Sequence, residues 1–216
     1  MKTTEHTGQI LKYLSITPDN YNSEQKYPLV ILLHGYGSHM GDLASLCESI
    51  NSEDYIYISP NAPIPIDFGI GSVGFAWSEI GEENHEEILI PFFQEIFDQF
   101  NVDMGHIALG GFSQGGIMTY KNGLTNPQLF RGLFILSGKM PNLDDPSTLL
   151  INKSQGIFIA HGTDDGIISV ADARKAKKLL VNYGYSPKYS EYDMAHQITP
   201  EVLTDLKVWL NQILGS

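Results

Sequence analysis

Short apolar runs alternate along the chain with longer segments in which apolar residues recur every three or four positions. The short runs end at glycine or proline, and most are apolar throughout, which is typical of parallel strands covered on both faces. Alternation of such strands with helices predicts an α/β protein with a mostly parallel sheet. The predicted strands span 29–34, 55–59, 106–110, 132–137, 156–161 and 187–192, with 9–16 as a further candidate edge strand.

Five segments have the period of a helix. They are predicted at 41–50, 86–100, 114–124, 170–183 and 199–213. In 86–100, the side chains of Ile88, Phe92, Ile96 and Phe100 fall on one stripe, and the acidic residues lie largely elsewhere. This pattern predicts an amphipathic helix that packs on the core.

The segment 60–81 breaks the alternation. It is too rich in proline and glycine for a helix and too long for an ordinary connection. Its apolar side chains, which include Ile70, Phe75 and Trp77, predict that it packs against the protein rather than staying disordered.

Three glycines of that segment, Gly69, Gly71 and Gly74, match the dinucleotide pattern G-x-G-x-x-G. The pattern binds a pyrophosphate only where it joins a strand to a helix. No clear strand precedes it here and no helical segment follows, so we do not expect a dinucleotide site.

Length and composition narrow the function further. A chain of 216 residues predicts one domain spanning 1–216. With 42% hydrophobic and 18% charged residues and no long apolar run, neither disorder nor stable membrane insertion is expected. The net charge of −12 repels phosphate backbones, so we expect no nucleic-acid partner.

Cys47 is the single cysteine, so no internal disulfide can form. No C-x-x-C pair or H-E-x-x-H motif offers metal ligands at a working spacing, and we expect neither a metal nor another cofactor. The start of the chain lacks the apolar stretch of a signal peptide. These features predict a cytoplasmic protein.

The sequence GFSQG at 111–115 matches G-x-S-x-G. It follows the predicted strand 106–110 directly and leads into the predicted helix 114–124. A sharp turn between a strand and a helix requires glycines on both sides and lifts the serine hydroxyl above the sheet. The context predicts that Ser113 is a nucleophile.

A serine hydroxyl needs a base within hydrogen-bond reach and an acid that orients the base. Of the seven histidines, only His196 lies in a loop after a strand and downstream of both the serine and a candidate acid. The acid lies in the loop after 156–161, where Asp164 and Asp165 are both candidates by spacing.

Acyl transfer also requires two hydrogen-bond donors for the oxyanion. The expected donors are the backbone N–H groups of Gln114, directly after the nucleophile, and of Tyr36, in the glycine-rich loop after 29–34. The side chains of these two residues need have no part in this role.

The motifs LLHGYGS, SPNAP, GFSQGG, HGTDD and AHQI, in this order, resemble the phospholipase/carboxylesterase family of α/β-hydrolases, which includes the acyl-protein thioesterases. The resemblance covers about residues 25–213. It implies an α/β-hydrolase fold with about seven strands, no large cap domain and no cofactor, and it places the acid at Asp165. The chain departs from the family in having Ile168 and Ser169 in place of V-P, and Ala195 in place of glycine.

The resemblance implies hydrolysis of a small-molecule ester, an acyl thioester or a lysophospholipid through an acyl-enzyme at Ser113. An acylated protein is a further substrate by family analogy, and the chain is expected to be a monomer or a homodimer. Ile70, Phe75, Trp77 and Met140 are candidates for the acyl-chain pocket. Equally, the aromatic residues of 60–81 could only plug the edge of the sheet.

Two other functions are weighed against this hypothesis. A non-catalytic protein could use the same cleft to bind a ligand, because a fold does not fix function. A ligand-binding protein has no need of a serine, a histidine and an aspartate together, however. A peptidase on this fold would need a large lid or propeller, for which the chain has no room.

Overall fold

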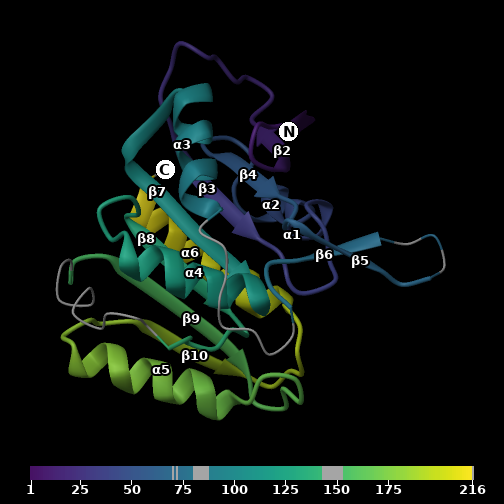
Figure 1. The fold of residues 1–216 in the computed structure, drawn as a ribbon. Helices are drawn as coiled ribbons and strands as arrows, with labels where there is room; N and C mark the ends of the chain where they lie inside the picture. The colour runs from purple at the N-terminus through teal and green to yellow at the C-terminus, as the bar shows by residue number, and fades with distance from the viewer. Residues whose placement is uncertain (70, 72, 80–87, 143–152, 216) are drawn as a thin grey trace.

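In a computed structural model, which describes residues 1–69, 71, 73–79, 88–142 and 153–215, eight strands form one sheet (Figure 1). Its order is β1-β2-β4-β3-β7-β8-β9-β10, and all neighbours are parallel except β1 with β2 and β2 with β4. The strands are β1 (Lys2–Thr7), β2 (Lys12–Thr17), β3 (Tyr27–Leu33), β4 (Ile56–Pro60), β7 (Val102–Phe112), β8 (Gly132–Leu136), β9 (Gly156–Gly162) and β10 (Lys188–Tyr192). The prediction of an α/β protein with a mostly parallel sheet is confirmed, with eight strands rather than about seven.

Helices cover both faces of this sheet (Figure 1). They are α1 (Gly41–Ala44), α2 (Cys47–Ile50), α3 (Leu89–Gln99), α4 (Gln114–Thr125), α5 (Val170–Asn182) and α6 (Pro200–Leu214). Side chains of β3 alternate between the faces: Leu29 and Ile31 pack with α3, α4 and α5, whereas Val30 and Leu32 pack with α1, α2 and α6. Both sets of side chains are buried, which explains why the strand sequences are continuous apolar runs.

Helix α3 has the predicted amphipathic character. Phe92 and Ile96 of the expected stripe are fully buried, as are Leu89 and Phe93 beside them. The start of the predicted segment, 86–87, lies outside the described residues.

The segment 41–50 is two short helices rather than the one predicted helix. The backbone N–H and the hydroxyl of Ser45 both donate to the carbonyl oxygen of Asp42, at 3.3 Å and 2.6 Å. This side-chain bond competes with the regular helical ladder and ends α1. The two helices still share one buried face, since Leu43, Cys47 and Ile50 are all buried.

The apolar pattern does not predict β1, because its side chains are all polar and most are exposed. Strand β1 is held instead by antiparallel pairing with β2. The edge strand predicted at 9–16 begins only at Lys12, since Gln9 and Ile10 form the turn between β1 and β2. Their N–H groups donate to the Glu95 carboxylate of α3, at 2.8 Å and 3.0 Å.

Within 60–81 the chain forms an antiparallel hairpin, β5 (Ile64–Asp67) with β6 (Val73–Ala76), which extends away from the sheet (Figure 1). Gly69 and Gly71 lie in its turn, with φ of 76° and 75°. Gly74 lies in β6. The three glycines of the dinucleotide pattern therefore belong to a hairpin and not to a junction between a strand and a helix.

Candidate active site

Ser113 lies between the end of β7 and the first residue of α4. Its φ of 56° and ψ of −116° are strained for a residue with a side chain. The turn is tight because a Cβ at Gly115 would lie 1.9 Å from the carbonyl oxygen of Leu33, and one at Gly111 would lie 2.7 Å from it. The flanking glycines are therefore required by the close approach of β3.

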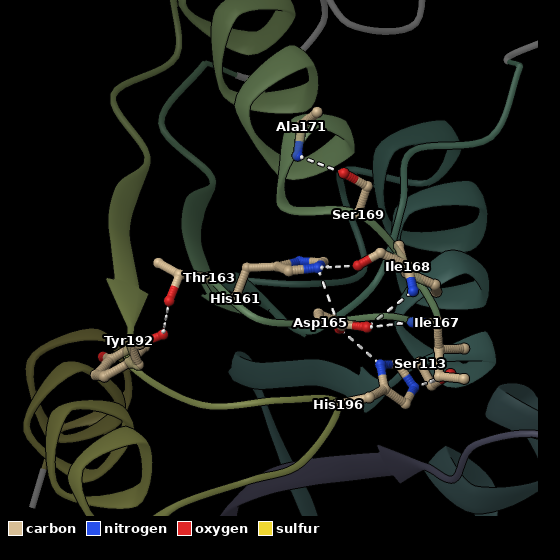
Figure 2. Close-up of polar contacts among 10 residues, drawn as sticks. All are labelled: Ser113, His161, Thr163, Asp165, Ile167, Ile168, Ser169, Ala171, Tyr192 and His196. Carbon is tan, nitrogen blue, oxygen red and sulfur yellow. Dashed lines mark hydrogen bonds and ion pairs between the residues drawn. The ribbon is translucent and has the colours of Figure 1, made fainter.

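His196 connects Ser113 to Asp165 (Figure 2). Its Nε2 lies 2.8 Å from the Ser113 Oγ, and its Nδ1 lies 2.7 Å from the Asp165 Oδ2. A carboxylate only accepts hydrogen bonds, so Nδ1 carries the proton and Nε2 is free to accept one from the serine hydroxyl. Of the two acids that spacing left open, Asp165 is the one that contacts His196.

Asp165 lies in the loop after β9, and its side chain is completely covered. Its Oδ1 accepts hydrogen bonds from the N–H groups of Ile167 and Ile168, both at 2.9 Å. Burial by itself raises the pKa of this carboxyl group. The hydrogen bonds from His196 and from the two amides outweigh burial and hold the pKa below its ordinary value, so the group is ionised.

The loop after β3 lies against the nucleophile, since a Cβ at Gly35 would be 3.4 Å from the Ser113 Cβ. The next residue, Tyr36, is 40% exposed. Among the residues that the structure describes, the N–H groups of Tyr36 and Gln114 have no hydrogen-bond acceptor. Both predicted oxyanion donors are thus available to a ligand.

His34 holds the start of that loop. It is fully buried, and its Nε2 accepts from the Ala62 N–H at 3.1 Å, so the proton is on Nδ1, which donates to the Gly35 carbonyl at 2.7 Å. Burial lowers the pKa of His34, which keeps the ring neutral.

The hairpin holds the rest of the loop. Phe75 of β6 accepts from the Gly37 N–H at 2.8 Å and donates to the Ser38 carbonyl at 2.7 Å. A Cβ at Gly74 would lie 2.0 Å from the Gly37 carbonyl oxygen, so only glycine fits in β6 at this contact. The hairpin therefore fixes the backbone directly after Tyr36, and His34 holds the backbone before it.

The side chain of Gln114 has a role that the sequence pattern does not indicate. Its Oε1 accepts from the Trp77 N–H at 2.9 Å, and its Nε2 donates to the Ser78 carbonyl at 2.9 Å. The indole N–H of Trp77 in turn donates to the His34 carbonyl at 2.8 Å. Gln114, Trp77 and His34 thus connect the two predicted oxyanion donors through one set of hydrogen bonds.

The predicted pocket residues have different environments. Trp77 is 3% exposed and belongs to the core, whereas Phe75 and Met140 are partly buried against it. Ile70 lies outside the described residues. The contacts of Phe75 and Trp77 place both beside the loop that carries Tyr36. Their part in an acyl pocket stays a prediction.

Comparison with known proteins gives the family. The model of the phospholipase/carboxylesterase family matches residues 20–214, nearly the whole chain. The chain belongs to this family. The protein is accordingly a carboxylic ester hydrolase with an α/β-hydrolase fold.

Among curated relatives, the acyl-protein thioesterase 1 of Kluyveromyces lactis is 29% identical over 211 residues, which cover 86% of this chain and 92% of the relative. Among solved structures, a carboxylesterase from Mesorhizobium loti has a TM-score of 0.81 at 19% identity, covering 97% of this chain and 99% of that one. The acyl-protein thioesterase 2 of Zea mays has a TM-score of 0.73 at 18% identity, covering 94% and 99%. The two structures show that the fold is shared.

Among the residues that the structure describes, none of the helices is both long and apolar enough to span a bilayer. Nor does that part of the chain bring three or more histidine, cysteine or acidic side chains together as metal ligands.

Proposed function

We propose that the protein hydrolyses carboxylic esters or thioesters through an acyl-enzyme at Ser113, with His196 as general base and acid and Asp165 as the group that orients it. The hydrogen-bonded series from the Ser113 Oγ through His196 to the Asp165 Oδ2, at 2.8 Å and 2.7 Å, carries this proposal. The ionised state of Asp165 supports it, because a charged carboxylate stabilises the imidazolium that forms during reaction.

The reaction has two steps. The Ser113 Oγ attacks the substrate carbonyl carbon while its proton moves to the His196 Nε2, and the oxyanion accepts hydrogen bonds from the N–H groups of Tyr36 and Gln114. The intermediate then expels an alcohol or thiol, which receives the proton from His196. Water attacks the acyl-enzyme in the same way, releasing the acid and restoring Ser113.

The substrate class that we favour is an ester or thioester with an apolar acyl chain. Curated relatives are named acyl-protein thioesterases, which supports an acylated protein as one candidate and a small ester or lysophospholipid as others. Large apolar side chains exposed near the site support an apolar substrate: Tyr36 is 40% exposed, and Ile167, whose N–H binds Asp165, is 75% exposed. Ile70, Phe75, Trp77 and Met140 remain our candidates for contacts with the acyl chain.

The experiment that tests this function measures hydrolysis of p-nitrophenyl esters from acetyl to palmitoyl, together with a palmitoyl thioester peptide. Ser113→Ala is compared with Ser49→Ala, which removes the exposed hydroxyl of a serine in α2 that has no place in the proposed mechanism. We expect turnover in the wild type and in Ser49→Ala, and loss by several orders of magnitude in folded Ser113→Ala. Absence of turnover in the wild type on every substrate would favour a ligand-binding function instead.

A further inference from the structure

A second imidazole contacts Asp165. His161, in β9, is fully buried, and its Nε2 lies 2.8 Å from the carbonyl oxygen of Ile168 and 3.3 Å from the Asp165 Oδ2. Figure 2 shows Asp165 between His161 and His196, with an interaction drawn to each. His161 does not touch Ser113 and has no part in the reaction steps described above.

The surroundings of His161 determine where its proton lies. Both atoms that face Nε2 are oxygens that only accept, the carbonyl of Ile168 and the ionised carboxylate of Asp165. Nε2 therefore carries the hydrogen and donates it to the Ile168 carbonyl, with the Asp165 Oδ2 as a longer electrostatic contact. The other ring nitrogen, Nδ1, is buried without a hydrogen-bond partner. His161 thus places its Nε2 hydrogen between the Ile168 carbonyl and the acid.

This donor closes the loop that carries Asp165. The bond from His161 to Ile168 spans seven residues and holds the backbone whose amides at Ile167 and Ile168 bind the Asp165 Oδ1. The loop also fits closely against the segment before His196, because a Cβ at Gly162 would lie 2.2 Å from the carbonyl oxygen of Met194. The position of Asp165 relative to His196 therefore depends on the loop that His161 closes.

We propose that His161 is a positioning residue for ester hydrolysis, acting through the Asp165 carboxylate that it shares with His196. The proposal rests on the function proposed above. The His161 Nε2 also lies 3.3 Å from the Oδ2 that accepts from His196, so the positive end of the Nε2–H dipole partly offsets the negative charge that Oδ2 presents to His196. Without this donor, Asp165 is less fixed in orientation and attracts the proton of His196 more strongly.

Other groups around the site are left in place when His161 is replaced. His196 faces the Ser113 hydroxyl and the ring of Phe112, whose centroid is 4.8 Å away. The other carboxylates of the two loops, Asp164 and Asp193, are exposed. A change in pH dependence that is specific to His161 therefore comes through Asp165.

The test compares His161→Leu, which removes the donor at similar size, with His161→Gln, whose amide can donate from the same place. Tyr57→Phe is the control, because it removes the partly buried hydrogen bond from a core side chain to the Asn51 carbonyl, which involves no residue of the site. We expect His161→Leu to lower kcat about 10- to 100-fold with little change in KM, as misorientation does. We also expect the acid limb of its kcat/KM profile to move up by roughly half a pH unit. His161→Gln should restore most of the wild-type kcat and most of the wild-type pH profile. Tyr57→Phe should change neither kcat nor the pH profile.

A folded His161→Leu protein with wild-type kcat and pH profile would overturn the proposal, as would a His161→Gln protein that behaves like His161→Leu. If His161→Leu does not fold, nitrogen-15 NMR of the imidazoles in the wild type decides: the hydrogen of His161 is expected on Nε2, and a hydrogen on Nδ1 would contradict the argument. Failure of the proposed function is distinguishable from failure of this proposal. In that case the wild-type protein itself would show no hydrolysis that is lost in Ser113→Ala.

Discussion

The two sides of the candidate site are held in different ways. On one side, Asp165 and His196 lie in loops after β9 and β10 and are positioned by hydrogen bonds to an ionised carboxylate. On the other, the N–H groups of Tyr36 and Gln114 are positioned by bonds among neutral groups, most of them from the hairpin and its following residues. The geometry of Asp165 and His196 should therefore depend on charge and pH. The geometry of the Tyr36 and Gln114 N–H groups should instead depend on the packing of the hairpin, which is distant in sequence.

The largest loss of kcat is expected from a substitution on the charged side of the site, at Asp165. Asp165→Asn keeps the size of the side chain but removes the charge and lets the wrong ring nitrogen of His196 carry the proton, so kcat should fall by about 10⁴-fold. Asp164→Asn, one residue away and exposed, is the matched control. Steady-state kinetics of both variants makes the measurement, and a similar loss in both would mean that the acid has been misassigned.

The second expected effect is on the neutral side. Gln114→Leu keeps the backbone donor but breaks the bonds to Trp77 and Ser78, so kcat should fall about 10- to 100-fold through a displaced oxyanion site. Gln94→Leu, which removes an exposed amide of α3, should leave kcat unchanged. The pH profile of Gln114→Leu should keep the shape of the wild type. A shifted acid limb there would show that the two sides are not separable.

The pH dependence of stability should also distinguish the sides. Because the pKa of Asp165 is lower in the folded protein than in the unfolded chain, its ionised form stabilises the fold above about pH 3.9, and this contribution is lost as the pH falls through the folded-state value. Urea unfolding should show wild type more stable than Asp165→Asn at pH 7, with the difference shrinking in acid. A difference independent of pH would exclude this linkage.

The smallest expected effect is at the side chain of Tyr36. Only its N–H is proposed to act, so Tyr36→Ala should change kcat on a short ester within about threefold. A rise in KM confined to long acyl esters would assign the exposed ring to substrate binding. A large loss of kcat on every ester would mean that the ring helps to position the loop.

The sequence predicts those parts of the molecule that are encoded locally. The turn around Ser113 is such a part, because the glycines at 111 and 115 flank the serine in a short pattern between a predicted strand and a predicted helix. The core strands are another, since burial on both faces needs apolar residues throughout. The order of residues after successive strands predicts His196 and limits the acid to Asp164 or Asp165, and the family resemblance implies Asp165.

The remainder depends on contacts between segments far apart in the chain. The bond from Gln114 to Trp77 joins residues 37 apart, and no local pattern marks it. Strand β1 is polar and exists through pairing with β2. His161 precedes a glycine at a strand end just as His34 does, yet the first contacts Asp165 and the second holds the loop that carries Tyr36. Only the folded structure distinguishes the contacts of these two histidines.

The most direct test of the account is covalent labelling with a fluorophosphonate, which phosphonylates an activated serine. Mass spectrometry of the digested protein should find the adduct on Ser113, with ester hydrolysis lost in proportion to labelling, and Asp165→Asn should react much more slowly. Hydrolysis that persists in fully labelled protein, or an adduct on another residue, would contradict the assignment of Ser113 as the nucleophile.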